Sequence, residues 1–261
     1  VLAGRAGGSG WSGAWQAQYW NTTPPGTYYI TQIAVDEPGL DYQDLAVTSN
    51  RFVTTPNAWT YGDWGATTEA PFSRNRRVLG LDGNMHLVNP NNTFGKPGTT
   101  NWISFLARFE SGTPEEYGID LSVNNDPNDI GLLAVGRVPE TTTWGAWVPG
   151  TSLQVLSTND ATSGTAFLVA RLAFDETQDT LHLWVNPGLG AEPPAAAAVE
   201  LAGIPHIEFN RIGLRGAGTP APLASLDELR LGDSWESVTP IIPEPTALLG
   251  LAALAAAFRR R

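Results

Sequence analysis

The sequence predicts an all-β protein, an antiparallel β-sandwich followed by a short hydrophobic C-terminal helix. Short segments of alternating apolar and polar residues recur between turn clusters, which is the pattern of antiparallel strands. The composition is rich in Thr, Gly, Pro, Asn and aromatic residues, which suits a loop-rich β domain. No segment before residue 246 shows a convincing helical period.

The alternating segments give the expected strands in chain order. Turn clusters such as Asp36-Glu37-Pro38-Gly39 and Asn186-Pro187-Gly188 separate them. The stretch 191–199 contains two prolines and is expected to be a loop. No internal repeat or linker precedes residue 238, so we expect one domain over residues 1–240. The expected strands span residues 28–35, 44–54, 102–110, 117–123, 132–138, 152–157, 166–175, 179–185, 207–214 and 226–231.

The best-defined strand pair is expected over residues 164–187. In the first strand the even-numbered residues of 166–174 are all apolar and share one face. In the second strand residues 181, 183 and 185 share one face, with His182 and Trp184 on the other. The polar segment 175–179 connects them, so the sequence predicts a β-hairpin here.

Charge and cysteine content exclude several classes of function. The chain carries 15 Lys and Arg against 26 Asp and Glu, for a formal net charge of −11. Such a body repels phosphate backbones and anionic lipid heads, so we expect no nucleic-acid partner. Cysteine is absent, which excludes disulfides, thiolate nucleophiles and cysteine-based metal sites.

The last residues, 241–261, form a separate tail. Residues 246–258 carry no charge and as a helix would span about 20 Å. The hydrocarbon layer of a bilayer is about 30 Å thick, so this would be a marginal transmembrane anchor. Three terminal arginines favour a cytoplasmic C-terminus. Pro243 and Pro245 disfavour helix around Glu244, which we expect to be extended and accessible.

The order Pro243-Glu244-Pro245, residues 246–258 and Arg259-Arg260-Arg261 resembles the PEP-CTERM sorting signal of Gram-negative bacteria. The resemblance implies an exosortase-type processing enzyme as partner and transient anchoring in the inner membrane. It further implies export to the cell surface or extracellular matrix. We also expect a secretory signal upstream of Val1. The alternatives are an amphipathic helix that docks on the body and a permanent single-span anchor.

The body resembles the laminin-G-like, concanavalin-A-like jelly rolls of exported bacterial proteins. The resemblance rests on residues 167–174, 181–187 and 226–235, and on the opening segment 7–15. It implies two packed antiparallel sheets, with sugar or calcium sites on one concave face or rim.

A sugar-binding platform is predicted in the segment NAWTYGDWG, residues 57–65. Exposed aromatic rings stack on sugar rings, and neighbouring polar side chains bind the hydroxyl groups. Trp144 and Trp147 offer a second candidate pair. Because the chain holds ten Trp, the alternative is that these rings belong to the core. The residues of the first candidate site are Asn57, Trp59, Tyr61, Asp63 and Trp64.

Asp227 shares strand parity with Leu229 and Leu231, which predicts a carboxylate that points into the core. A buried carboxylate must be paired or hydrogen-bonded. It is therefore either structural, accepting backbone N–H bonds or an Arg, or a calcium ligand near the edge of the sandwich. Apart from this Ca²⁺ we expect no cofactor. The acidic residues that could add ligands are Asp36, Glu37, Asp41 and Asp44.

No catalytic motif stands out in the sequence. The adjacent acids Asp175-Glu176 and Asp227-Glu228 point to opposite faces of a strand, and no alternating run of acids matches a glucanase signature. His86, His182 and His206 are widely spaced. The sequence therefore predicts a non-catalytic protein that binds extracellular polysaccharide. A purely structural matrix or surface-coat protein is the alternative, and a divergent glycan hydrolase or lyase is a third.

Overall fold

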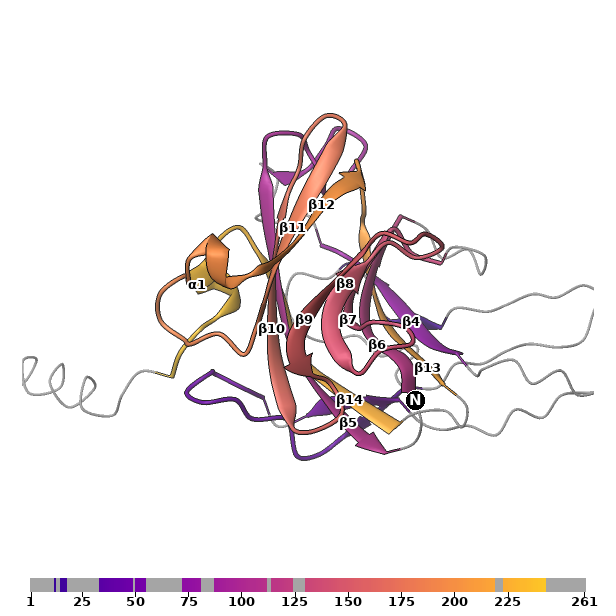
Figure 1. Ribbon diagram of the computed structural model, residues 1–261, viewed down its shortest axis with the longest axis vertical. Helices are drawn as coiled ribbons and strands as arrows, with labels where there is room; N and C mark the ends of the chain where they lie inside the picture. The colour runs from indigo at the N-terminus through magenta and orange to yellow at the C-terminus, as the bar shows by residue number, and fades with distance from the viewer. Residues whose placement is uncertain are drawn as a thin grey trace, which may run out of the picture.

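Two antiparallel β-sheets make up the body of the protein in the computed structural model (Figure 1). Within the part of the chain that the structure describes, each sheet has seven strands, which confirms the predicted all-β, antiparallel architecture. The residues that the structure describes are 12, 15–17, 33–48, 50–54, 72–80, 87–111, 114–123, 130–218 and 223–242.

We call the first sheet sheet I. Its spatial order is β1-β4-β13-β6-β7-β8-β9, and every neighbouring pair is antiparallel. The order brings together strands from the start, middle and end of the chain. The bounds are β1 (Gln16–Ala17), β4 (Phe72–Val78), β6 (Pro114–Ser122), β7 (Leu133–Arg137), β8 (Thr143–Trp147), β9 (Gln154–Asp160) and β13 (Arg211–Gly218).

We call the second sheet sheet II. Its spatial order is β12-β11-β10-β5-β14-β3-β2, again antiparallel throughout. The bounds are β2 (Ile33–Asp36), β3 (Arg51–Thr54), β5 (Thr100–Ser111), β10 (Thr165–Ala173), β11 (Gln178–Val185), β12 (Val199–Pro205) and β14 (Leu223–Gly232).

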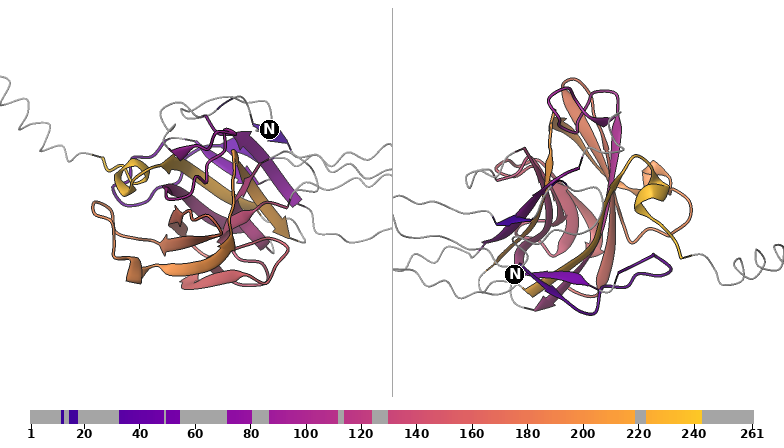
Figure 2. Two further views of the ribbon diagram at one scale, coloured as in Figure 1. Left: turned by 90° about the horizontal axis from the view of Figure 1, so that it is seen from above. Right: turned by 180° about the vertical axis from the view of Figure 1, so that it is seen from behind.

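The main hydrophobic core lies between the two sheets, which face each other in Figure 2. Sheet II contributes Phe105 and Leu168, and sheet I contributes Tyr117, Trp144 and Leu214. All five are at most 1% exposed. Full burial of such a side chain contributes about 1.5–3 kcal/mol, so this interface holds the sandwich together.

The predicted hairpin is present as β10 and β11. The even-numbered residues from 166 to 172 enter the inter-sheet core, as does Phe174 just after β10, whereas Phe167 and Val169 face the other side of sheet II. Val169 lies opposite Trp184 in the register of the two strands. The alternation of apolar residues on both faces therefore reflects a sheet that is buried on both sides here.

A second layer covers the outer face of sheet II. The helix α1 (Trp235–Val238) lies on the side of this sheet that faces away from sheet I (Figure 1). Trp235 packs edge-on against Trp102 and Trp184, and Leu40 joins the same cluster from the segment after β2. This small outer cluster explains why Trp184 is only 2% exposed although it points away from the core.

Several expected elements differ from the structure. No strand was expected where β1, β4, β8 and β12 form. The β4 sequence FSRNRRV lacks apolar alternation. The stretch 191–199, which was expected to be a loop, contains a 3₁₀ turn (Ala195–Ala197), and β12 begins at its last residue. Of the expected strand 44–54 only β3 forms, because residues 39–48 are a loop docked on β14.

The predicted C-terminal helix over residues 246–258 lies outside the described residues. In the part of the chain that the structure describes, α1 is the only α-helix. No helix in these described ranges has the length and apolar character that crossing a membrane requires.

Candidate functional site

Asp227 lies in β14 and points away from the inter-sheet core, which corrects its predicted orientation. Leu226 lies in the inter-sheet core, and Leu229 and Leu231 pack against the same core. Because an odd number of positions separates each of them from Leu226, an unbroken strand would place them on the opposite face. The register shifts between Asp227 and Arg230, which marks a β-bulge that reverses the alternation. The parity argument failed because it assumed an unbroken strand.

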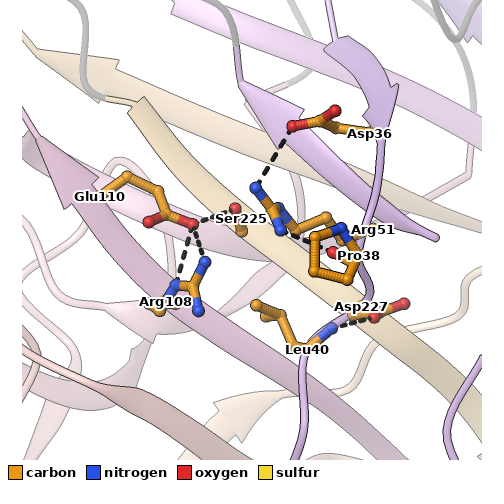
Figure 3. Close-up of polar contacts among 8 residues, drawn as sticks. All are labelled: Asp36, Pro38, Leu40, Arg51, Arg108, Glu110, Ser225 and Asp227. Carbon is orange, nitrogen blue, oxygen red and sulfur yellow. Dashed lines mark hydrogen bonds and ion pairs between the residues drawn. The ribbon is translucent and has the colours of Figure 1, made fainter. Parts of the chain in front are cut away.

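The carboxylate of Asp227 anchors the loop 39–48 to sheet II. One of its oxygens accepts the backbone N–H group of Leu40 at 2.7 Å (Figure 3). The other accepts the backbone N–H group of Glu228 at 2.8 Å. Asp227 is 3% exposed, and this burial raises its pKa to about 6 although both hydrogen bonds act in the opposite direction. Asp227 thus accepts two backbone N–H bonds, as the first of its two predicted roles requires.

The acidic residues near β2 do not join Asp227 in a metal site. Asp36 instead pairs with Arg51 at 3.2 Å, and Arg51 also donates to the carbonyl oxygen of Pro38 (Figure 3). Within the described ranges no three His, Asp or Glu side chains converge as metal ligands would. These acidic residues therefore do not supply the ligands of the predicted calcium site.

The two predicted aromatic platforms have different outcomes. Trp144 is 1% exposed in the inter-sheet core, where it packs edge-on against Tyr117 at 5.3 Å. Trp147 is 4% exposed, so neither residue is an exposed sugar platform, and the alternative that these rings are buried is confirmed. The first platform, residues 57–65, lies outside the described residues, as does the sorting motif at 243–261.

The outer face of sheet I carries an unexpected group of charged side chains. Arg76 and Asp120 form an ion pair at 3.3 Å, and both side chains are 0% exposed. Arg215 donates from Nε to Glu116 at 3.0 Å, and its guanidinium lies 5.2 Å from the ring of Trp147. We call these residues the charged face.

The strand register explains how these side chains meet. Arg76 of β4 and Asp120 of β6 both lie opposite Gly213 of β13, one on each side. A Cβ at Gly213 would lie 2.1 Å from Oδ1 of Asp120. The absence of a side chain at Gly213 therefore lets Arg76 reach across β13 to Asp120.

The charged side chains on the outer face of sheet I indicate a function, because the hydrophobic core does not require them. Glu116 and Asp120 alternate with the core residues Tyr117, Ile119 and Leu121, so they project from the face turned away from sheet II. Buried ion pairs add little net stability compared with apolar packing. Charged side chains placed where the core does not need them are typical of functional sites, which makes this face the best candidate site.

Sequence reasoning missed the charged face. The segment that holds Arg76 contains too few apolar residues to be recognised as a strand, and Glu116 and Asp120 lie four positions apart, so they do not form the alternating run of acids of a glucanase signature. A signal was present, since five of the 15 basic residues fall in β4 and β13 alone. They are Arg74, Arg76, Arg77, Arg211 and Arg215.

Comparison with known proteins gives structural neighbours but no sequence relatives. No family model and no curated protein sequence matches the chain. An endo-1,3-β-glucanase from Streptomyces sioyaensis matches with a TM-score of 0.42 and 13% identity, over 87% of this chain and 98% of that one. Peanut lectin matches with a TM-score of 0.32 and 10% identity, over 84% and 99%.

The binding domain of botulinum neurotoxin DC matches with a TM-score of 0.38 and 11% identity, over 90% of this chain and 50% of that one. The chain thus spans half the length of that structure. Because these TM-scores are low, the description of the fold and of the candidate site rests only on the strand register and the side-chain contacts of this chain.

The comparison corrects one expectation. The sequence predicted a protein without catalytic activity because no glucanase signature was found. The similar solved structures include glucanases beside lectins, so the exclusion of an enzyme does not hold.

Proposed function

We propose that the protein is an exported carbohydrate-binding protein with a concanavalin-A-like jelly-roll body, and that the charged face of sheet I is its saccharide site. The observation that carries the proposal is the pair of buried ion pairs, Arg76–Asp120 and Arg215–Glu116, on a sheet face turned away from the core. Buried ion pairs add little net stability compared with apolar packing, and charged groups of this kind are typical of ligand sites, which supports the proposal.

The chemistry of Arg215 and Glu116 suits sugar hydroxyl groups, and their side chains keep 5% and 8% exposure, whereas Arg76 and Asp120 are 0% exposed and contact no ligand directly. Carboxylates accept hydroxyl hydrogens and guanidinium groups donate to hydroxyl oxygens, and such charge-assisted hydrogen bonds are strong. The ring of Trp147 and the carbonyl oxygen of Ile130 further hold the guanidinium of Arg215. Groups that are already fixed lose little conformational entropy when they bind a ligand.

Exposed apolar side chains border the charged face. Leu156 of the edge strand β9 is 42% exposed, and its register partner in β8 is Gly145. Ile130, whose carbonyl oxygen accepts from Arg215, is 45% exposed. Saccharide sites combine a few fixed polar groups with apolar surface for the ring faces, and both kinds of group adjoin here.

The tail supports the proposal of export. Pro243-Glu244-Pro245, the uncharged stretch 246–258 and the terminal arginines have the order of a PEP-CTERM signal. We therefore propose processing by an exosortase-type enzyme, transient anchoring in the inner membrane and release to the surface or extracellular matrix. Intact mass of the native protein from culture fluid and membranes tests this. Full-length protein in the cytosol would contradict it.

Binding is tested with the purified chain on an array of neutral and acidic glycans. Glu116→Gln removes one charge from the charged face, and Glu192→Gln is the matched control, because Glu192 pairs with Arg171 on sheet II. We expect Glu116→Gln to weaken binding at least tenfold and the control to bind like wild type. Equal loss in both variants would argue against the charged face as the site.

The same preparation is incubated with each polysaccharide that binds, and the release of reducing ends is measured. Release that Glu116→Gln abolishes would add catalysis to binding at this face. Failure to bind any glycan, with the fold intact by circular dichroism, would refute carbohydrate binding and favour a structural coat protein.

A further inference from the structure

Backbone hydrogen bonds fix the end of the described chain to the body. The N–H group of Ile242 donates to the carbonyl oxygen of Asp44 at 2.9 Å, and the N–H group of Ala46 donates to the carbonyl oxygen of Pro240 at 2.9 Å. An antiparallel β-bridge joins the same two segments between these bonds. The body therefore holds the chain in one geometry as far as Ile242.

The two segments of this ladder are themselves anchored to sheet II. Asp227 of β14 holds loop 39–48 through a backbone N–H group. The carbonyl oxygen of Val238, at the end of α1, accepts a hydrogen bond from the hydroxyl of Ser104 in β5 at 2.6 Å, and Val238 is 0% exposed. We call loop 39–48 together with residues 235–242 the exit corner. It is a built part of the body from which the tail continues.

A short piece of chain joins the exit corner to the apolar stretch 246–258, namely residues 243–245. An extended chain spans about 3.3–3.6 Å per residue, so Thr246 lies at most about 14 Å from Ile242. A bilayer is about 40–45 Å thick with a hydrocarbon core of about 30 Å, which leaves about 5–8 Å for each headgroup layer. The remainder, about 6–9 Å, is less than the diameter of a helix, about 10–12 Å. Insertion of the stretch 246–258 therefore brings the exit corner to the membrane surface.

Apolar side chains are exposed where this contact would form. Ile241 is 50% exposed and Ile242 is 55% exposed. These are the two highest exposed fractions among the large apolar side chains of the described residues. Removal of such apolar surface from water is favourable, so contact with the interface of a bilayer would stabilise this position.

The charged side chains of the exit corner are all acidic. Its two segments contain Asp41, Asp44 and Glu236, all three exposed, and no Lys, Arg or His. Arg230 lies beneath the loop but is paired with Glu228, so it does not offset this charge. Anionic lipid heads would repel the exit corner, whereas zwitterionic headgroups carry no net charge. The corner therefore suits a zwitterionic lipid surface.

We propose that the exit corner rests on a zwitterionic lipid surface while the tail is inserted in the membrane. The inference rests on the proposed anchoring through the tail and adds which surface of the body meets the lipid. The helix α1 lies on the outer face of sheet II, whereas the charged face lies on the outer face of sheet I (Figure 1). The charged face is thereby on the side of the sandwich away from the membrane, where an extracellular saccharide can reach it.

Fluorescent labels on single cysteines test the proposal, because the chain has no cysteine of its own. Gln43→Cys places the label on the exit corner. Thr158→Cys is the matched control, because Thr158 is exposed like Gln43 but lies in β9 of sheet I. The full chain is reconstituted into phosphatidylcholine vesicles whose headgroups carry a nitroxide, which quenches fluorescence only at short range. We expect severalfold stronger quenching at position 43 than at position 158.

Three changes should weaken the quenching at position 43. A Gly-Ser insert of about ten residues between Ile242 and Pro243 adds a reach of about 16–19 Å, so the exit corner can leave the surface. Ile242→Ser keeps the backbone hydrogen bond but removes exposed apolar surface, whereas Leu156→Ser on β9 is the control without effect. Phosphatidylglycerol in place of part of the phosphatidylcholine should weaken the contact at low salt, and added salt should restore it because salt screens the repulsion.

Co-sedimentation with the vesicles separates this inference from the proposed function. If the chain co-sediments while both labels are quenched equally, or while the insert changes nothing, the exit corner is not the contact surface and the proposed anchoring stands. Stronger quenching in the presence of phosphatidylglycerol would overturn the preference for zwitterionic lipid. A folded chain, as judged by circular dichroism, that does not co-sediment would refute the proposed anchoring and this inference together.

Discussion

Asp227→Asn removes a charge from a carboxylate whose burial disfavours ionisation. In the folded chain Asp227 has a pKa of about 6, against 3.8 for an unperturbed Asp. Each pKa unit corresponds to 1.36 kcal/mol, so the two values differ by about 3 kcal/mol. Because the folded-state pKa is the higher one, Asp227 stabilises the fold below about pH 4, and this contribution is lost as the pH rises through 6.

Urea unfolding of wild type and variant from pH 3.5 to 7.5, followed by Trp fluorescence, measures this effect. We expect the stability of Asp227→Asn relative to wild type to rise by about 3 kcal/mol between pH 4 and pH 7. Titrations elsewhere, such as that of Glu208 with its lowered pKa, occur in both proteins and cancel in the difference. A constant offset is also expected, because the Asn amide must face a backbone N–H.

The pH dependence of the stability difference between Asp227→Asn and wild type tests this assignment. A flat curve would show that the carboxylate ionises as easily in the folded chain as in the unfolded one. A curve that falls with pH would mean that the two backbone N–H bonds outweigh the burial. Either result would refute the assignment of Asp227 as a carboxylate dominated by desolvation.

Three further substitutions test the packing. Gly213→Ala should destabilise the fold by about 1–3 kcal/mol, because its Cβ would lie 2.1 Å from Asp120, and urea unfolding measures the loss. Tyr117→Phe should cost about 1 kcal/mol, since the buried hydroxyl donates to the carbonyl oxygen of Ala161; an unchanged urea midpoint would contradict this. Ser234→Ala removes the N-cap of α1 and should also cost about 1 kcal/mol, seen as a lower melting temperature.

The strands that the sequence predicted correctly are those whose apolar pattern depends only on neighbouring residues. The hairpin of β10 and β11 was predicted with its faces correct, because period-two alternation depends only on neighbouring residues. By contrast β4 was missed, since its strand structure comes from pairing with β13 rather than from its own arginine-rich sequence. The bulge at Asp227 was missed for a similar reason, because loop 39–48 stabilises it from a distant part of the chain.

The charged face shows the same division. Each of its residues is visible in the sequence, yet Arg76 and Asp120 are 44 residues apart, and Glu116 and Arg215 are 99 apart. Only the order β4-β13-β6 brings them to one surface. Whether Trp144 and Trp147 are exposed or buried could not be decided from the sequence, because exposure depends on what packs above a strand, which local polarity does not reveal.

The sequence by itself determined that this is an acidic, cysteine-free, antiparallel β protein, and it located the strands with regular alternation. The sorting signal and the platform at residues 57–65 remain predictions from the sequence. Only the tertiary structure decided which strands are neighbours, where a bulge reverses the faces, and which charged side chains meet. The physical reason is that side-chain alternation arises within one strand, whereas ion pairs and burial arise between segments joined by sheet formation.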